Sequence, residues 1–203
     1  MGGKWDDLLE IYAAMQEDAA WAHLRRPGIN LVPGDGPESA ETARVFVVGE
    51  APGAHENGQR RPFVGASGHI LNELLASVGL ERRDCFVTNV VKYRPPGNRT
   101  PTGSEILQAL DTLRDEWSVI DPVLTIAVGS PAQHALSQWN FPHGVLHPFS
   151  RGHPDRFVTS VYHPAFGLRR RQAQAWIEAE WRRLGEEIAM LEIGKEIGCH
   201  DVQ

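Results

Sequence analysis

A run of β-branched and aromatic residues that ends abruptly in an acidic turn is the strongest constraint on how this sequence folds. Residues 44–56 read RVFVVGEAPGAHE, so the apolar run stops at Gly49 and is followed by Glu50 and Glu56. A short apolar run bounded by turn residues is typical of a strand buried on both faces of a parallel sheet. Because open α/β proteins bind ligands at the carboxyl ends of such strands, this turn predicts the active-site edge.

Three more strand patterns alternate with helix patterns along the chain. We expect strands at residues 84–91, 123–128 and 156–161. Apolar residues at helical spacing predict helices before Pro27, after a Ser67 cap, after a capping box of Thr102 and Glu105, after Pro131, and up to Leu191. The alternation predicts an α/β fold, a three-layer αβα sandwich with a central four-stranded parallel sheet and right-handed crossovers.

Length and composition are those of one ordinary globular domain. The chain has 203 residues, of which 41% are hydrophobic, so we expect a single domain over residues 1–203, with residues 1–30 as an N-terminal helix and connector and residues 194–203 as a flexible tail. Neither a membrane span nor a secretory signal is predicted, so we expect a cytoplasmic monomer with no membrane partner. The net charge of -6 disfavours indiscriminate binding of nucleic acid, although local patches decide this.

Cysteine and histidine do not form a metal-binding pattern. The two cysteines, Cys85 and Cys199, are too few for a disulfide framework or a four-cysteine metal site. His143, His147 and His153 lie close in sequence but lack the spacing of a structural zinc site. We therefore expect no metal site.

Polar side chains stand where three of the four predicted strands end. Glu50 follows the first strand, Asn89 lies near the end of the second, and His163 follows the fourth. Because the carboxyl ends of parallel strands meet at one edge of a sheet, we expect these three side chains to converge.

Five short motifs that occur in order carry a resemblance to a known family. They are GEAPG at residues 49–53, PFVG at 62–65, TNVVK at 88–92, RPPGNR at 94–99 and HPA at 163–165. Together they closely resemble the family 4 uracil-DNA glycosylases, and the resemblance covers residues 24–191. It implies the uracil-DNA glycosylase fold and a monofunctional enzyme of base excision repair. Such an enzyme flips uracil out of DNA and hydrolyses its N-glycosidic bond, leaving an abasic site.

The resemblance also implies roles for residues around the base. His163 would donate a hydrogen bond to the departing uracil anion, and Glu50 and Glu56 would orient water or stabilise the sugar cation, with the division between them left open. Other readings are a histidine satisfied by backbone, solvated glutamates, a turn residue at Asn89 and core packing at Phe63. The substrate-binding positions implied are Ala51 and Gly53 in the acidic turn, Phe63 for stacking and Asn89 for reading the base edge.

The same resemblance implies contacts with DNA outside the base pocket. Gly65, Ser67 and Gly68 would offer backbone N–H groups to a phosphate at a helix start. An apolar wedge would come from Phe166 and Leu168, although Gly167 stands where the family often has leucine. The remaining DNA-binding positions implied are Asn98, Arg99 and Arg169, the last of which could instead begin a solvated helix.

One feature of the family is missing from this sequence. Family 4 enzymes generally hold an iron-sulfur cluster on four cysteines, and the four equivalent positions here are Ala19, Ala22, Tyr93 and Ala109. These side chains cannot ligate iron, so we expect no cluster and no other cofactor.

Two functional hypotheses follow from the sequence. In the first, the protein excises uracil from single- or double-stranded DNA. In the second, it is a superfamily member that binds DNA or a modified base with little uracil excision, as suggested by the lost cysteines, by Gly167, and by Ala51, which stands where related families place a water-activating Asp or Asn. Glu50, Phe63, Asn89 and His163 occurring together favour the first hypothesis.

Overall fold

The protein is described here from a computed structural model. The described residues are 3–136, 144–150, 153–169, 171–194, 196–197 and 199. Within these ranges, six side chains fall outside the description, those of Ser150, His153, Pro154, Leu168, Arg169 and Arg171.

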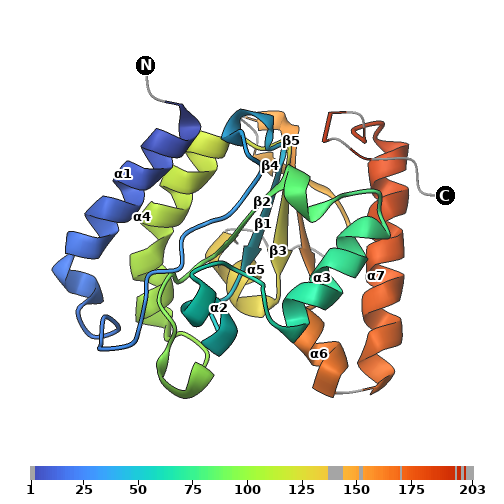
Figure 1. The fold of residues 1–203 in the computed structure, drawn as a ribbon. Coiled ribbons are helices and arrows are strands. Elements are labelled where there is room, and N and C mark those ends of the chain that lie inside the picture. The colour runs from blue at the N-terminus through green and yellow to red at the C-terminus, as the bar shows by residue number, and fades with distance from the viewer. Residues whose placement is uncertain are drawn as a thin grey trace.

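A five-stranded sheet forms the centre of the fold, with strand order β2-β1-β3-β5-β4 (Figure 1). The strands β1 (Val45–Gly49), β2 (Cys85–Asn89), β3 (Leu124–Val128) and β5 (His153–Val161) are mutually parallel, which confirms the four predicted strands. The edge strand β4 (His147–Ser150) pairs antiparallel with β5 and was not predicted. It contains Pro148, which suits only a sheet edge and obscures the strand pattern in sequence.

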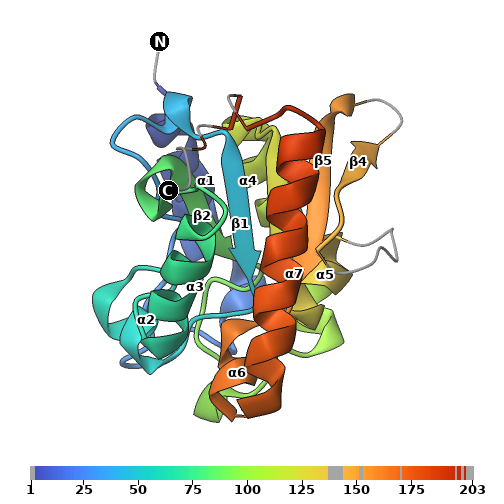
Figure 2. The same cartoon turned by 90° about the vertical axis from the view of Figure 1, so that its right-hand side faces the viewer.

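Helices cover both faces of this sheet and confirm the three-layer sandwich (Figures 1 and 2). On one face pack α1 (Lys4–Glu17), α4 (Gly103–Ile120) and α5 (Ser130–Leu136), and on the other α3 (Ala66–Ala76), α6 (Pro164–Arg169) and α7 (Arg171–Met190). The short helix α2 (Ala54–Gln59) lies at the carboxyl ends of the strands. Single 3₁₀ turns occur at Ala19–Trp21, Ala40–Thr42, Arg82–Asp84 and Pro96–Asn98.

Strand β1 explains why the apolar run in the sequence shows no alternation. Val45 and Val47 belong to the core under α3 and α7, whereas Phe46 and Val48 belong to the core under α1 and α4. All four side chains are fully buried. A strand that supplies both cores must be apolar at every position.

Local expectations for the helices were met in part. The capping box is confirmed, since the Thr102 side chain accepts from the Glu105 N–H and the Glu105 carboxylate accepts from the Thr102 N–H. The prediction that Ser67 caps α3 was wrong, because α3 begins at Ala66 and its N-cap is Gly65. Within the expected flexible tail, Ile197 is 1% exposed and belongs to the core under α7.

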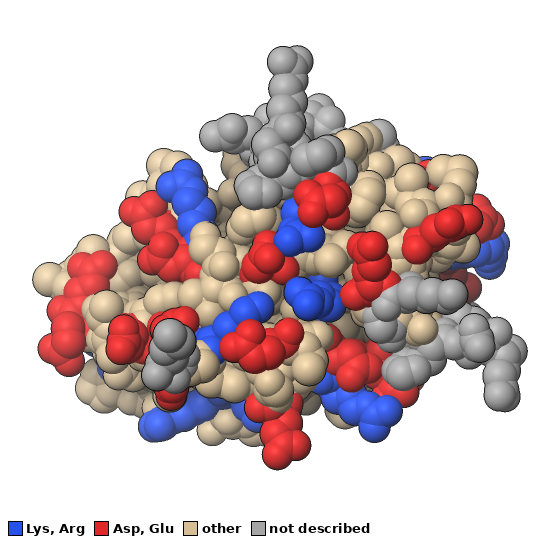
Figure 3. All heavy atoms as spheres, turned by 90° about the horizontal axis from the view of Figure 1, so that it is seen from above, with Lys and Arg blue, Asp and Glu red and all other residues tan. Residues whose placement is uncertain are grey.

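The surface away from the carboxyl edge carries charges of both signs. Figure 3 views the molecule from the amino ends of the strands, where Lys and Arg side chains stand beside Asp and Glu side chains. Among the described residues, no helix is both long and apolar enough to cross a membrane.

Candidate active site

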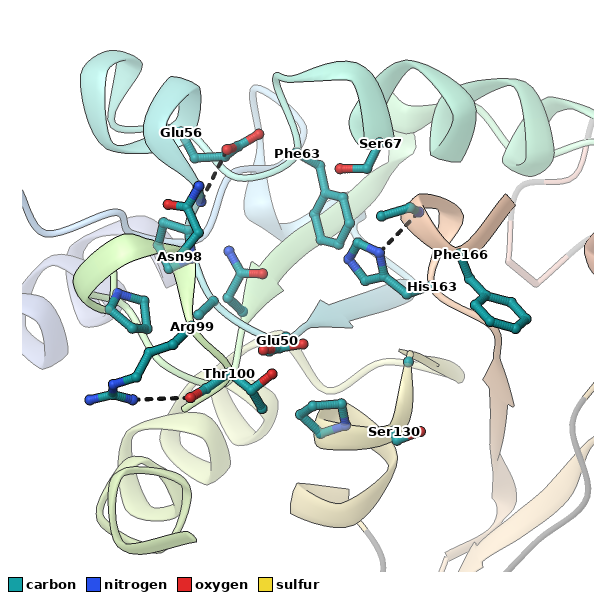
Figure 4. A pocket seen from close by; sticks show the side chains of 18 of the residues that line it. Glu50, Glu56, Phe63, Ser67, Asn98, Arg99, Thr100, Ser130, His163 and Phe166 are labelled. Carbon is teal, nitrogen blue, oxygen red and sulfur yellow. Dashed lines mark hydrogen bonds between the residues drawn. The ribbon is translucent and has the colours of Figure 1, made fainter. Parts of the chain in front are cut away.

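A cavity of about 790 Å³ opens at the carboxyl ends of the parallel strands (Figure 4). It brings together the three residues expected to converge, Glu50, Asn89 and His163. The other predicted site residues that line it are Ala51, Gly53, Glu56, Phe63, Ser67, Asn98, Arg99 and Phe166. Gly65 and Gly68 do not line the cavity, and the side chains of Leu168 and Arg169 lie outside the described residues.

Asn89 and Phe63 meet across a glycine that ends β1. In the parallel ladder Gly49 pairs with Asn89, which is 3% exposed. A Cβ added at Gly49 would stand 2.6 Å from the Asn89 Oδ1 atom and would clash with the Phe63 ring. Glycine at this position therefore lets an amide and an aromatic ring approach each other at the base of the cavity.

His163 follows β5 and faces Phe63. Its Nδ1 atom accepts a hydrogen bond of 3.2 Å from the Ala165 N–H, so a neutral ring carries its proton on Nε2. The rings of His163 and Phe63 are 5.9 Å apart at 27° (Figure 4). Gly129, with φ +88°, leaves room for this arrangement, because a Cβ there would be 3.1 Å from the His163 Cβ. In the neutral histidine, Nδ1 is thus the acceptor and Nε2 the donor.

Glu56 binds backbone rather than presenting a carboxylate to the cavity. One oxygen accepts from the N–H groups of Val64 and Gly65 at 3.0 and 2.8 Å, and the other accepts from the Gly53 N–H at 3.1 Å. These three bonds hold the acidic turn and the loop before α3 together. They also occupy the N–H groups of Gly53 and Gly65, so a phosphate at the Gly65 N–H, which stays a prediction, would compete with Glu56.

Gly68 is required by close packing against the backbone of Phe63. Its N–H donates to the Gly65 carbonyl at 2.9 Å, and a Cβ at this position would overlap the Phe63 carbonyl. The phosphate contact expected through the Gly68 N–H stays a prediction. Ser67, between them, keeps its side chain in the cavity lining.

The loop with Asn98 and Arg99 is braced within the protein. The Arg94 Nε donates to Asn98 Oδ1 at 2.6 Å, and Arg99 makes two bonds of 2.8 and 2.7 Å to the Glu105 carboxylate. Arg99 lowers the pKa of Glu105 to about 2. In Figure 4 the Arg99 guanidinium points away from Phe63. The charge of Arg99 is thus already paired, which the sequence did not reveal.

A buried ionic network lies directly behind Asn89. The Lys92 ammonium donates to the Asn89 carbonyl, to Thr88 Oγ1 at 2.8 Å and to the Glu116 carboxylate at 2.6 Å, and both charged side chains are 0% exposed. The Tyr12 hydroxyl donates to the other Glu116 oxygen at 2.5 Å. Burial lowers the pKa of Lys92 against the opposing effect of Glu116, and burial raises the pKa of Tyr12. Sequence reasoning missed this network.

A second buried carboxyl group lies behind His163. Glu180 on α7 accepts a hydrogen bond of 2.7 Å from the Tyr162 N–H, one residue before the histidine. Burial raises the pKa of Glu180 to about 7, although this bond and the charge of Arg183 both act to lower it. The backbone that carries His163 is therefore anchored by a group that titrates near neutrality.

The positions expected to have lost an iron-sulfur cluster do not fit one. Tyr93 and Ala109 are buried in the core under α1 and α4, and the Tyr93 ring lies 6.0 Å from that of Trp21. Ala19 and Ala22 flank Trp21 in the 3₁₀ turn after α1. None of these side chains is a thiolate, and among the described residues no group of three His, Cys, Asp or Glu could hold a metal ion.

The cavity also contains residues that the sequence reasoning did not select. Strand β3 ends at Val128, and the segment that follows it lines the same edge. The rule that located the other three strand ends would have found it. The additional lining residues are Pro52, Pro95, Thr100, Gly129, Ser130, Pro131, Tyr162 and Ala165.

Comparison with known proteins gives a consistent result. The uracil DNA glycosylase superfamily profile matches residues 37–185. The type-4 uracil-DNA glycosylase of Archaeoglobus fulgidus is 37% identical over 80% of this chain and 84% of its own. The type-4 uracil-DNA glycosylase of Thermotoga maritima is 36% identical over 82% of this chain and 86% of its own. That of Pyrobaculum aerophilum is 45% identical over 54% of this chain and 54% of its own.

Proposed function

Because this chain belongs to the uracil DNA glycosylase superfamily, and within it to the type-4 family, we propose that it excises uracil from DNA. The enzyme flips the uracil nucleotide into the cavity and hydrolyses its N-glycosidic bond, leaving an abasic site. The observation that carries this proposal is the meeting of Asn89, Phe63, Glu50 and His163 in one cavity at the carboxyl edge of the sheet.

Base recognition falls to Asn89 and Phe63. The Asn89 amide can donate to one uracil oxygen and accept from the ring N–H, a pairing that the amine of cytosine does not offer. The Phe63 ring supplies an apolar face for the base to stack on. The network behind Asn89 supports this role, because it holds the backbone of a residue whose side chain must stay in one orientation.

His163 stabilises the departing base. Breaking the N-glycosidic bond leaves an anionic pyrimidine, and a hydrogen-bond donor aimed at its oxygen acts mainly in the transition state. With Nδ1 accepting from the Ala165 N–H, the proton on Nε2 serves as that donor.

Glu50 acts at the sugar. The sugar becomes cationic and oxocarbenium-like, so a nearby carboxylate stabilises it and orients the attacking water. Glu50 lines the cavity directly after β1 (Figure 4). Both oxygens of Glu56 accept backbone hydrogen bonds that join the acidic turn to the loop before α3. We therefore assign the catalytic carboxylate to Glu50 and a positioning role to Glu56.

The DNA strand lies along the rim, where Ser67, Asn98 and Phe166 line the cavity. Leu168 and Arg169 remain predicted DNA contacts. We further propose that the protein works as a single domain, as a monomer in the cytoplasm, without an iron-sulfur cluster. The four non-cysteine positions support the last point, so we expect purified protein to be folded and colourless, whereas near-stoichiometric iron and sulfide would contradict it.

Single- and double-stranded oligonucleotides bearing uracil, hypoxanthine, xanthine or hydroxymethyluracil test the activity. Incubation followed by alkaline strand scission should cut at uracil. Tight binding of these oligonucleotides without any scission at uracil would favour a binding protein instead.

A further inference from the structure

A row of aromatic side chains leads out of the cavity onto α7. Tyr162 and Phe166 line the cavity, and their rings stack 5.6 Å apart at 26°. Trp176, on the first turns of α7, continues the row at 6.5 Å from Phe166 and 31°. Tyr162 is 37% exposed and Trp176 is 56% exposed, which is unusual for large aromatic side chains. The row therefore begins in the lining of the proposed active site, where Figure 4 shows Phe166, and ends at the exposed ring of Trp176.

Chain connectivity determines what reaches this row. A uracil in the cavity remains covalently joined to its neighbours, so the adjacent nucleotides must cross the mouth of a cavity whose lining includes Tyr162 and Phe166. Aromatic side chains in proteins that bind single strands stack with successive bases regardless of sequence, because every base has a π-face. In a duplex the neighbouring bases remain paired and stacked on each other, so they are not available to these rings.

We propose that Tyr162, Phe166 and Trp176 form a stacking platform for the unpaired bases beside the flipped uracil, and that the enzyme therefore prefers single-stranded DNA. The proposal rests on the proposed glycosylase function and specifies its substrate. Trp176 is the residue that distinguishes the platform from the cavity itself, because it lies outside the cavity lining.

The charges around Trp176 fit recognition by stacking better than recognition of phosphate. The part of α7 that follows Trp176 in sequence carries charges of both signs, with Glu178, Glu186 and Glu187 as well as Arg182 and Arg183. The whole chain has a net charge of -6. Because the chain as a whole is negatively charged, we expect contact with a single strand to depend more on the bases than on counterion release.

Binding and cleavage by Trp176→Ala test the platform. The binding probe is a fluorescent oligodeoxythymidine without uracil, single-stranded or annealed to its complement, so this measurement does not require catalysis. Trp176→Ala should bind the single strand about tenfold more weakly, while binding of the duplex changes by less than about twofold. Trp176→Phe, which keeps an aromatic face, should recover most of the loss. Leu9→Ala is the matched control, since Leu9 is 63% exposed on α1 over the opposite face of the sheet.

Uracil excision under single-turnover conditions separates this proposal from the proposed function. We expect the parent to act faster on the single strand and Trp176→Ala to lose that preference. If the parent excises uracil but Trp176→Ala loses nothing, or loses equally on both substrates, the platform is wrong and the glycosylase function stands. If the parent excises no uracil, the function fails, and the uracil-free probe still decides the platform. A parent that dimerises in gel filtration and becomes monomeric as Trp176→Ala would assign the rings to an interface between copies and overturn the proposal.

Discussion

The two sides of the cavity are supported by different chemistry. On the side of β2, Asn89 is backed by a buried pair of opposite charges, Lys92 and Glu116, with Tyr12 bound to the carboxylate. On the side of β5, His163 is fixed by a neutral N–H of its own loop, and its backbone is anchored by Glu180, a carboxyl group with a pKa of about 7.

The difference matches what each side has to do. An amide that reads a base must hold one orientation, and the ion pair ties the backbone carbonyl of Asn89 to α4 and, through Tyr12, to α1. A buried ion pair is at best a weak source of net stability, so its contribution here is positional. The donor side has a looser and titratable anchor. We therefore expect loss of a charge behind Asn89 to change stability and base discrimination. We expect the stability contributed by the anchor behind His163 to depend on pH.

The largest expected effect comes from breaking the ion pair. Lys92→Met leaves the Glu116 carboxylate buried without its partner, and loss of one partner of a buried pair typically costs about 3 to 5 kcal/mol of unfolding free energy. Denaturant titration measures this. The double variant Lys92→Met/Glu116→Leu should recover most of the stability, because no buried charge remains.

The double variant also tests the positional role. It should fold and yet discriminate uracil from cytosine less well than the parent, since the donor to the Asn89 carbonyl is gone. If the double variant discriminates uracil from cytosine as well as the parent, the network has no role in positioning Asn89. A single variant as stable as the parent would show that the pair is not buried in solution.

Next in size is the loss of the donor. His163→Ala should lower the rate of uracil excision by about 100- to 1000-fold, or about 3 to 4 kcal/mol, with little loss of DNA binding, because the donor acts in the transition state. Single-turnover kinetics beside a thermal melt measures both effects. A histidine with only a structural role predicts a lower melting temperature with near-normal turnover. Cleavage within about threefold of the parent would remove His163 from the chemistry.

The anchor behind His163 should make stability depend on pH. Burial raises the pKa of Glu180 from its ordinary value of 4.5 to about 7 in the folded protein, so the folded state favours the protonated form. Stability from this group is fully present below about pH 4.5 and is lost as pH rises through about 7, a loss of up to about 3 kcal/mol. Glu180→Gln should remove this dependence, as measured by unfolding free energy across the window. The exposed Glu178→Gln on the same helix should retain it, and identical pH profiles for Glu180→Gln and the parent would refute the assignment.

The smallest effect is expected for base reading. Asn89→Asp places a carboxylate against the uracil oxygens and should weaken uracil excision by about 1 to 3 kcal/mol, roughly 5- to 150-fold. The carboxylate can accept from an exocyclic amine, so some cytosine excision should appear. The rates of excision from matched oligonucleotides that carry uracil or cytosine measure both changes. Unaltered uracil activity would place Asn89 outside the recognition contacts.

Much of the site could be located from the sequence because it depends on strand ends. Short apolar runs bounded by turn residues placed β1, β2, β3 and β5. The parallel arrangement then required their carboxyl ends to meet, so Glu50, Asn89 and His163 could be grouped in advance. The box at Thr102 and Glu105 was found for a similar reason, since its two partners are three residues apart. The edge strand β4 and the short helix α2 were missed, because neither has enough residues to show a period.

The sequence by itself determined which elements form and which polar residues reach the carboxyl edge, since both follow from local spacing and from the fixed geometry of a parallel sheet. Only the tertiary structure decided how those residues are held. Lys92 meets Glu116 across 24 positions, Tyr12 meets it across 104, and Glu180 binds the Tyr162 N–H across 18. A charge in a sequence looks solvated unless its partner is known. Whether Glu56 and Arg99 face the cavity or bind their own chain was therefore settled by packing, which brings together groups that no local pattern connects.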